Sequence, residues 1–314
     1  MKSLLYVITI VALSSSIFAQ QSIRIDGFVH LLDGYSKTPI GGQVQRSMVK
    51  LRLNNAQYGA VVNFDLAGPR LLHNAFIWFG LPPFGFVNSF KISFGKTIPI
   101  FGNNYPLYPS EIILINFNPS ASKMLTVRDV GLSAQWETPW VKGICSITNG
   151  TDTRLVNGGD NNNSRDISLR LVKKFWFFSV AASARFADAD FAKRLIGADI
   201  EVAYDSLKII SEIILSNIAG FPVLGQTNAL MLNAGNKESV GLNVMGVYSF
   251  SPCEFIADFD HYHSVVSTEQ TYTFGINYHL SKQVRFAVNC IQVENKTTGI
   301  ERKVLSQLEY KISI

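Results

Sequence analysis

Charged residues are scarce in this chain. Asp, Glu, Lys and Arg together make up 16% of its 314 residues, whereas about 25% is usual for a soluble domain. Hydrophobic residues nevertheless amount to 47%, so there is much apolar surface and little charge to cover it. A surface that faces water needs that polar cover, and one that faces lipid does not. The composition therefore favours a protein that exposes apolar side chains to a bilayer.

Cysteine and long apolar runs are also scarce. Cys145, Cys253 and Cys290 are an odd number without metal-ligand spacing, which favours small apolar residues over a disulfide or a reactive thiol. Beyond the N-terminal segment, no continuous apolar run reaches the roughly 20 residues of a spanning helix. The net charge of +5 argues only weakly for an anionic solute and gives no case for nucleic acid, which requires clustered basic residues. We expect no cofactor.

The N-terminus has the three parts of a secretory signal. Lys2 gives the positive start, residues 4–13 form an apolar run, and a stretch ending at Ala19 provides the small residues that precede a cleavage site. The apolar run is too short to span a membrane as a helix. We therefore predict a signal peptide at 1–19, followed by an exported outer-membrane β-barrel at 20–314.

Apolar and polar residues alternate up to the last residue. Leu308, Tyr310, Ile312 and Ile314 are apolar, and the residues between them are polar, as in a strand with one apolar face. The pattern recurs along the chain with no helical segment to cover that face. We predict an all-β fold, a transmembrane antiparallel β-barrel of 16 strands, at 22–33, 45–54, 57–67, 72–80, 88–97, 126–137, 141–149, 166–173, 176–186, 193–204, 206–216, 238–249, 253–265, 270–280, 283–294 and 301–314.

The connections between these strands alternate in length. Nearly all of the even-numbered connections are short, as at 55–56, 138–140 and 205, while the long ones at 103–125, 150–165 and 218–237 all fall among the others. Outer-membrane barrels have short periplasmic turns and longer external loops. The alternation therefore supports the barrel and puts both of its ends on the periplasmic side.

Three stretches add a resemblance through their order and spacing. They are Phe90 to Gly102 (FKISFGKTIPIFG), Arg128 to Leu132 (RDVGL), and the run from Ser146 to Leu171 that contains SITNG, DNNN and DISLRL. As a set they resemble the phosphate-selective porin O/P family. The resemblance implies a trimeric porin of sixteen strands whose third external loop, here 103–125, folds into the lumen and narrows it.

Two features depart from that family. Its members commonly end in Phe, whereas this chain ends in Ile314. Its phosphate-specific members also line the lumen with an arginine ladder and place lysines at the constriction, and these have no residue-by-residue match here. Phosphate selectivity therefore does not carry over.

Charged side chains on the inward phase of the strands are the candidates for a channel lining, because fixed charges replace part of an ion's hydration. The basic candidates are Arg24, Lys50, Arg52, Lys91, Lys142, Arg170, Arg185, Lys208 and Arg285, and the acidic ones are Asp199, Glu201, Glu212, Glu254, Asp258 and Asp260. We favour pairing of most of these charges across neighbouring strands over a dedicated binding ladder. Their distribution predicts a basic wall opposite an acidic wall, as in a general diffusion pore.

The segment 110–117 is apolar where an external loop should be polar. It needs cover, either from the barrel wall after folding inward or from an interface between protomers. In the first case Glu111 and Asn116 would reach the channel as constriction residues.

Two other patterns point elsewhere. His261 and His263 share one strand face, but without a third ligand a solvated pair is favoured over a metal site. Ser264 beside His263 has the residue types of a nucleophile and base, yet adjacent strand residues point to opposite faces. An outer-membrane phospholipase or protease is therefore disfavoured.

We thus expect a non-enzymatic, water-filled channel for passive diffusion of small hydrophilic solutes, with a mild preference for anions and phosphate as one candidate. Its expected partners are outer-membrane lipid, these solutes and further copies in a homotrimer. The alternative is a barrel plugged by its third loop that acts as a structural or adhesive surface protein.

Overall fold

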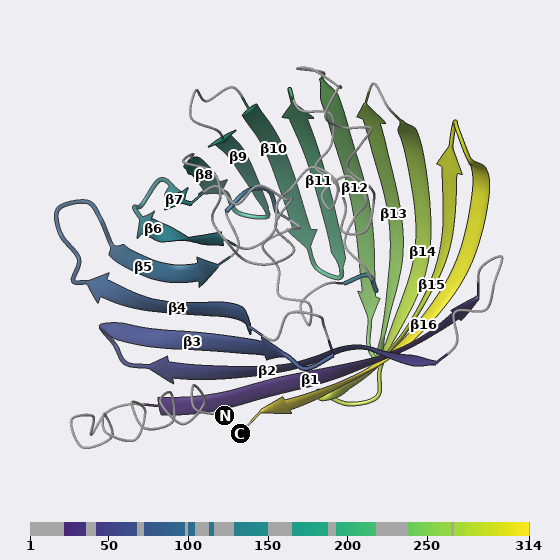
Figure 1. Cartoon of the computed structure of the whole chain (residues 1–314), viewed down its shortest axis with the longest axis horizontal. Helices are drawn as coiled ribbons and strands as arrows, with labels where there is room; N and C mark the ends of the chain where they lie inside the picture. The colour runs from purple at the N-terminus through teal and green to yellow at the C-terminus, as the bar shows by residue number, and fades with distance from the viewer. Residues whose placement is uncertain are drawn as a thin grey trace.

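The chain forms a single sheet that curls around and closes on itself (Figure 1). A computed structural model describes residues 22–35, 42–67, 72–97, 100–103, 113–115, 129–149, 165–187, 193–217, 238–264 and 267–313. The predicted signal peptide lies outside the described residues. Within them, no helix is long and apolar enough to cross a membrane.

Sixteen strands make up the barrel, as the alternating pattern predicts. They are β1 (Ser22–Tyr35), β2 (Gln43–Asn54), β3 (Tyr58–Asp65), β4 (Leu72–Leu81), β5 (Ser89–Thr97), β6 (Asp129–Glu137), β7 (Lys142–Thr148), β8 (Asp166–Lys174), β9 (Phe178–Ala187), β10 (Lys193–Tyr204), β11 (Leu207–Ser216), β12 (Ser239–Phe250), β13 (Cys253–Ser264), β14 (Thr268–His279), β15 (Val284–Asn295) and β16 (Gly299–Ser313).

Each strand pairs antiparallel with its neighbours in sequence, and β1 pairs with β16 to close the barrel. The closing register sets Asp26 opposite Ser313 and Tyr35 opposite Val304, so β1 begins at the end of the barrel where β16 stops. All backbone ladders are thereby paired and the sheet has no free edge, which is the condition for a sheet in lipid.

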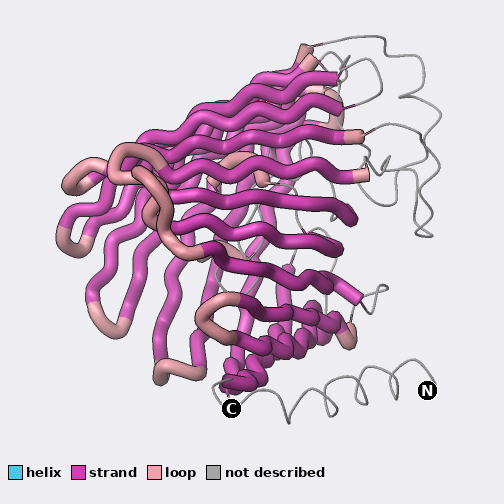
Figure 2. Tube along the Cα trace, turned by 90° about the vertical axis from the view of Figure 1, so that its left-hand side faces the viewer, coloured by secondary structure: helices cyan, strands magenta, loops and turns pink. Residues whose placement is uncertain are grey.

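Short turns gather at one end of the barrel, the left-hand end in Figure 2. They include the connections at 55–57, 175–177, 205–206 and 251–252. Asp205 adopts a left-handed conformation with φ of 51° in one of the tightest of them. We call this the turn end. The strands that flank the three long intervals, 98–128, 149–165 and 217–238, meet these intervals at the opposite end, as the alternation of connection lengths predicts.

The two faces of the sheet differ in chemistry. In β8 the side chains of Ile167, Leu169 and Leu171 point outward and are exposed, while Asp166 and Arg170 point inward and are buried. The same alternation recurs in β11 and β13. Burial of polar residues and exposure of apolar ones is the reverse of a soluble protein, and it fits a barrel with lipid outside.

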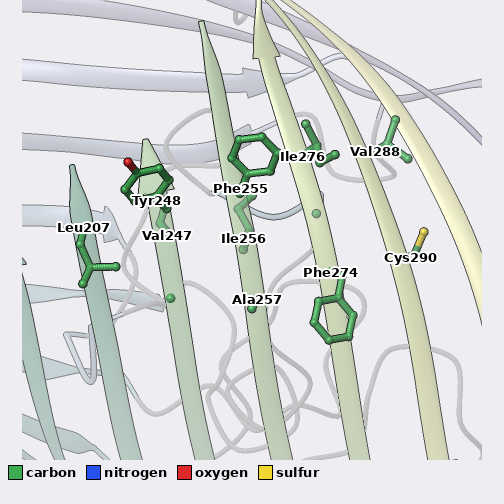
Figure 3. A pocket seen from close by; sticks show the side chains of 12 residues that line it. Leu207, Val247, Tyr248, Phe255, Ile256, Ala257, Phe274, Ile276, Val288 and Cys290 are labelled. Carbon is green, nitrogen blue, oxygen red and sulfur yellow. The ribbon is translucent and has the colours of Figure 1, made fainter. Parts of the chain in front are cut away.

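Aromatic side chains lie exposed near the turn end. Trp140, Trp176, Tyr204 and Tyr310 are examples, and Trp176 is 98% exposed. Such residues fit the aromatic girdle at a membrane–water interface. An apolar groove of about 570 Å³ also hollows the wall across β11 to β15, with Leu207, Tyr248, Phe255, Phe274 and Cys290 among its lining residues (Figure 3).

Candidate functional site

All candidate charges on the strands lie on the inner face, but their exposure separates them into two groups. Buried members are Arg170, Arg185, Arg285, Asp199, Glu212, Asp258 and Asp260. Those that remain partly or fully exposed are Arg24, Lys50, Arg52, Lys91, Lys142, Lys208, Glu201 and Glu254. Only the second group presents charge directly to the lumen.

Arg170 illustrates the buried group. It donates from Nη1 to Asp199 Oδ2 at 2.5 Å and from Nη2 to Asp199 Oδ1 at 2.9 Å. These bonds link β8 with β10 across the intervening β9, where Nη1 also donates to Ser183 Oγ at 3.0 Å. Arg185 of β9 pairs with Asp166 of the adjacent β8. Pairing across strands, the interpretation favoured from the sequence, therefore holds for these buried arginines.

A second cluster of paired charges lies at the seam between β1 and β16. Glu309 is fully buried and accepts a bond from Arg285 Nη2 at 3.1 Å. Its Oε2 lies 2.6 Å from His30 Nε2, and its Oε1 lies 3.0 Å from Lys311 Nζ. The cluster joins the first strand to the last two, so its charges serve to close the barrel.

The segment that follows β5 crosses to the opposite wall. Phe101 is buried and its ring packs against Gly197 of β10, where an added Cβ would lie 2.9 Å from the ring. The backbone N–H of Asn103 donates to Glu212 Oε1 at 3.0 Å, and its side-chain Nδ2 donates to Glu201 Oε2 at 3.2 Å. Two of the predicted lining acids therefore anchor this segment to the wall.

A later part of the same connection, 113–115, also lies within the barrel. Leu114 packs in an apolar cluster with Ile210, Met245, Val247 and Ile256 of β11 to β13.

Ile115, the next residue of this segment, packs against a different part of the wall, with Leu32, Ala287 and Leu305 of β1, β15 and β16. The backbone carbonyl of Ile113 accepts a bond from Asn277 Nδ2 at 3.1 Å. Of the two covers proposed for this apolar segment, the inner wall is thus the one observed for 113–115. Glu111 and Asn116, the predicted constriction residues, lie outside the described residues.

A cavity remains along the inner face of the wall formed by β2 to β7. It has a volume of about 440 Å³, and we call it the basic niche; its lining includes Lys50, Arg52, Asn63, Asn74, Trp78 and Lys91. Ile100, at the start of the crossing segment, lines it as well. None of the described lining residues is acidic. The niche therefore offers positive charge to the lumen on the side opposite the anchored segment.

The cations of the niche are held in different ways. Arg52 donates to Asp26 Oδ2 from Nη2 at 2.6 Å and from Nε at 2.8 Å. Lys91 has its Nζ 4.1 Å from the centroid of the Trp78 ring, and within the described part of the chain no carboxylate pairs with it. The Lys142 ammonium adds a like charge nearby. An aromatic ring orients an ammonium without cancelling its charge, so Lys91 keeps its attraction for anions.

Sequence reasoning missed the uncharged part of this site. Asn63, Phe76 and Trp78 line the niche but were not among the candidates, because only charges were sought on the inward phase. Trp78 could have been found by parity, since its neighbours Ile77 and Phe79 face outward and are exposed. A large aromatic on the inward phase of a barrel strand is itself a signal.

The other chemical candidates are not assembled. His263 is exposed and its Nδ1 lies 2.8 Å from Thr268 Oγ1, whereas Ser264 is buried on the inner face and donates to the carbonyl of Ser267. They point to opposite faces, as strand geometry predicts. Among the described residues, no group of three His, Cys, Asp or Glu side chains is placed to hold a metal ion.

Comparison with known proteins gives a match in structure only. The sequence matches no protein-family model and no curated protein. The anion-selective porin from Comamonas acidovorans is similar with a TM-score of 0.66 and 11% identity, over 93% of this chain and 100% of that one.

The outer-membrane channel DcaP of Acinetobacter baumannii is similar with a TM-score of 0.65 and 13% identity, over 94% of this chain and 98% of that one. OmpF of Salmonella typhi, in a complex with daunomycin, has a TM-score of 0.63 and 9% identity, over 93% and 97% of the two chains. At such identities the likeness shows the fold alone: this chain has the sixteen-stranded barrel seen in these porins.

Proposed function

We propose that this protein is an outer-membrane porin, a water-filled channel through which small hydrophilic solutes diffuse passively with a mild preference for anions. The observation that carries the proposal is the placement of the crossing segment. Hydrogen bonds and apolar packing hold 101–103 and 113–115 against the wall of β9 to β16. The basic niche faces the lumen from the wall of β2 to β7. A pore between an anchored segment and a basic wall passes solutes without any catalytic group.

Two further considerations support a location in the outer membrane. The outward face is apolar and ends in exposed aromatic residues at the turn end, and structures with the same fold are named as outer-membrane proteins. Export by the predicted signal peptide at 1–19 and assembly as a homotrimer remain part of the proposal. Native mass spectrometry of the detergent-purified protein measures the oligomer directly, and a mass of a single chain would contradict the trimer.

The test of the function is the zero-current potential of purified protein in a planar bilayer under a KCl gradient. We expect stepwise conductance with a potential whose sign reports chloride as the more permeant ion. The change Lys91→Gln removes a cation that no carboxylate of the described residues pairs with, and it should move the permeability ratio toward one. Lys173→Gln removes the same charge from the outer face of β8, where Lys173 Nζ lies 5.8 Å from the Phe175 ring, and should leave the ratio unchanged.

Other outcomes separate the alternatives. Block of the steps by inorganic phosphate at low concentration would favour the phosphate-selective porin O/P family over a general pore. If the folded protein gives no conductance steps in the bilayer, the proposed channel function is contradicted and the plugged surface barrel is favoured.

A further inference from the structure

The basic niche is larger than a simple inorganic anion requires. Its volume of about 440 Å³ lies within the range of roughly 300–1,000 Å³ that small-molecule sites occupy. Lys50, Arg52 and Lys91 are the basic residues of its lining, and Arg52 shares its charge with Asp26. A ligand that fills the niche therefore carries an anionic group together with a body of several further atoms.

Asn63 indicates which chemical groups the uncharged part of such a ligand carries. It is 1% exposed and lines the niche, and no donor among the described residues bonds to its Oδ1. A buried acceptor without a donor is energetically costly, and an ionised oxygen of an anion cannot supply the missing proton. A hydroxyl group of a solute can. The orphaned oxygen of Asn63 therefore points to a ligand with hydroxyl donors beside its charge.

Uncharged side chains complete the complementarity. Asn74, Ser93 and Gln135 add further hydrogen-bonding groups, and Phe76 and Trp78 add aromatic surface. The Trp78 ring packs closely on Gly59, where an added Cβ would lie only 2.5 Å from Nε1 of Trp78. This contact holds the ring in place. A few placed polar groups on an apolar wall suit a solute that has hydroxyls around a ring with C–H faces.

We propose that the basic niche binds hydroxylated organic anions of hexose size, sugar phosphates or sugar acids, as they pass through the barrel. The inference rests on the proposed channel and names its preferred solutes. The oxyanion of the solute lies among Lys50, Arg52 and Lys91. The side-chain Oδ1 of Asn63 accepts a hydrogen bond from a hydroxyl on the sugar ring, and the ring itself lies against Phe76 and Trp78.

The experiment measures transient block of single channels in KCl by four probes: glucose 6-phosphate, glucuronate, glucose and inorganic phosphate. We expect the first two to block at concentrations at least about tenfold lower than either of the last two. Comparison of glucose 6-phosphate with glucuronate shows whether the niche prefers a phosphate or a carboxylate. Equal block by inorganic phosphate, or equal block by glucose, would overturn the proposal.

Variants assign the effect to the niche. Asn63→Leu keeps the size of the side chain and removes its acceptor, so block by glucose 6-phosphate should weaken about tenfold while block by inorganic phosphate stays constant. Asn63→Asp keeps the shape if the leucine variant does not fold, and its negative charge should abolish block by both anions. Lys173→Gln is the control. An unchanged block in a folded Asn63 variant would contradict the assignment.

Isothermal titration of glucose 6-phosphate into detergent-solubilised protein separates this proposal from the channel itself. Binding without conductance would retain the niche and contradict the pore. Conductance without binding or block would retain the pore and contradict the niche.

Discussion

The guanidinium of Arg170 and the carboxylate of Asp199 form a two-pronged bond inside the wall, with side-chain exposures of 9% and 5%. A charge in this position cannot both satisfy its partner and attract a solute. From the sequence, Arg170 is indistinguishable from Lys91, since both lie on the inward phase of a strand. The difference arises from the tertiary structure, because Asp199 sits two strands away from Arg170, whereas Lys91 lies over the Trp78 ring and pairs with no carboxylate among the described residues.

We therefore expect Arg170→Met to act on stability. The change leaves Asp199 buried without its partner, and a broken buried pair costs about 3–5 kcal/mol. Urea unfolding in lipid vesicles, followed by fluorescence, measures the loss. The double variant Arg170→Met with Asp199→Leu removes both charges and should recover most of it. A double variant as unstable as the sum of the two single variants would show that the pair contributes no coupling.

At the scale of elements, the strands were predictable because alternation with a period of two is a local property. The tenth predicted strand, 193–204, has the bounds of β10, and all the other bounds differ by three residues or fewer. The fourth predicted strand, 72–80, also agrees with β4 to within one residue, although the inward phase of β4 carries Phe76 and Trp78 and both of its faces are apolar. The contacts of Phe101 and Leu114 with distant strands had no such local signal.

Gly102 allows a test of how the crossing segment is held. Its φ is +70°, and an added Cβ would lie 2.0 Å from Glu212 Oε1, the atom that accepts the bond from Asn103. We expect Gly102→Ala to release 100–103 from the wall of β9 to β11. Single-channel conductance should then change in size and become noisier.

Gly85→Ala is the matched control for that prediction. Gly85 also has a left-handed conformation, with φ of +56°, but an added Cβ there meets no atom within 4 Å. Both variants bear a conformational cost of roughly 1–2 kcal/mol, and only Gly102→Ala disturbs the segment. Identical conductance in the two variants would contradict the anchoring role of Glu212.

On the scale of the whole molecule, the arrangement is inverted relative to a soluble protein, with apolar residues exposed outside and charges buried inside. The inner face is not uniformly polar, however. Ile210, Met245 and Ile256 point inward and are covered by Leu114, while the opposite wall is left hollow. In the proposed channel this asymmetry sets the position of the water path, and it follows from the crossing segment, whose contacts a strand pattern does not encode.

Tryptophan quenching tests the inversion directly. Trp176 is 98% exposed in the turn between β8 and β9, whereas Trp78 faces the niche beside Lys91. In vesicles made with phospholipids brominated near the headgroup, a variant whose only tryptophan is Trp176 should lose emission severalfold more than a variant whose only tryptophan is Trp78. Aqueous iodide should quench the Trp78 variant instead, because the anion reaches this ring only through a water-filled lumen that attracts it. Quenching of Trp78 by bromolipid would place β4 with its other face toward lipid, and resistance to iodide would mean that the niche is closed to ions.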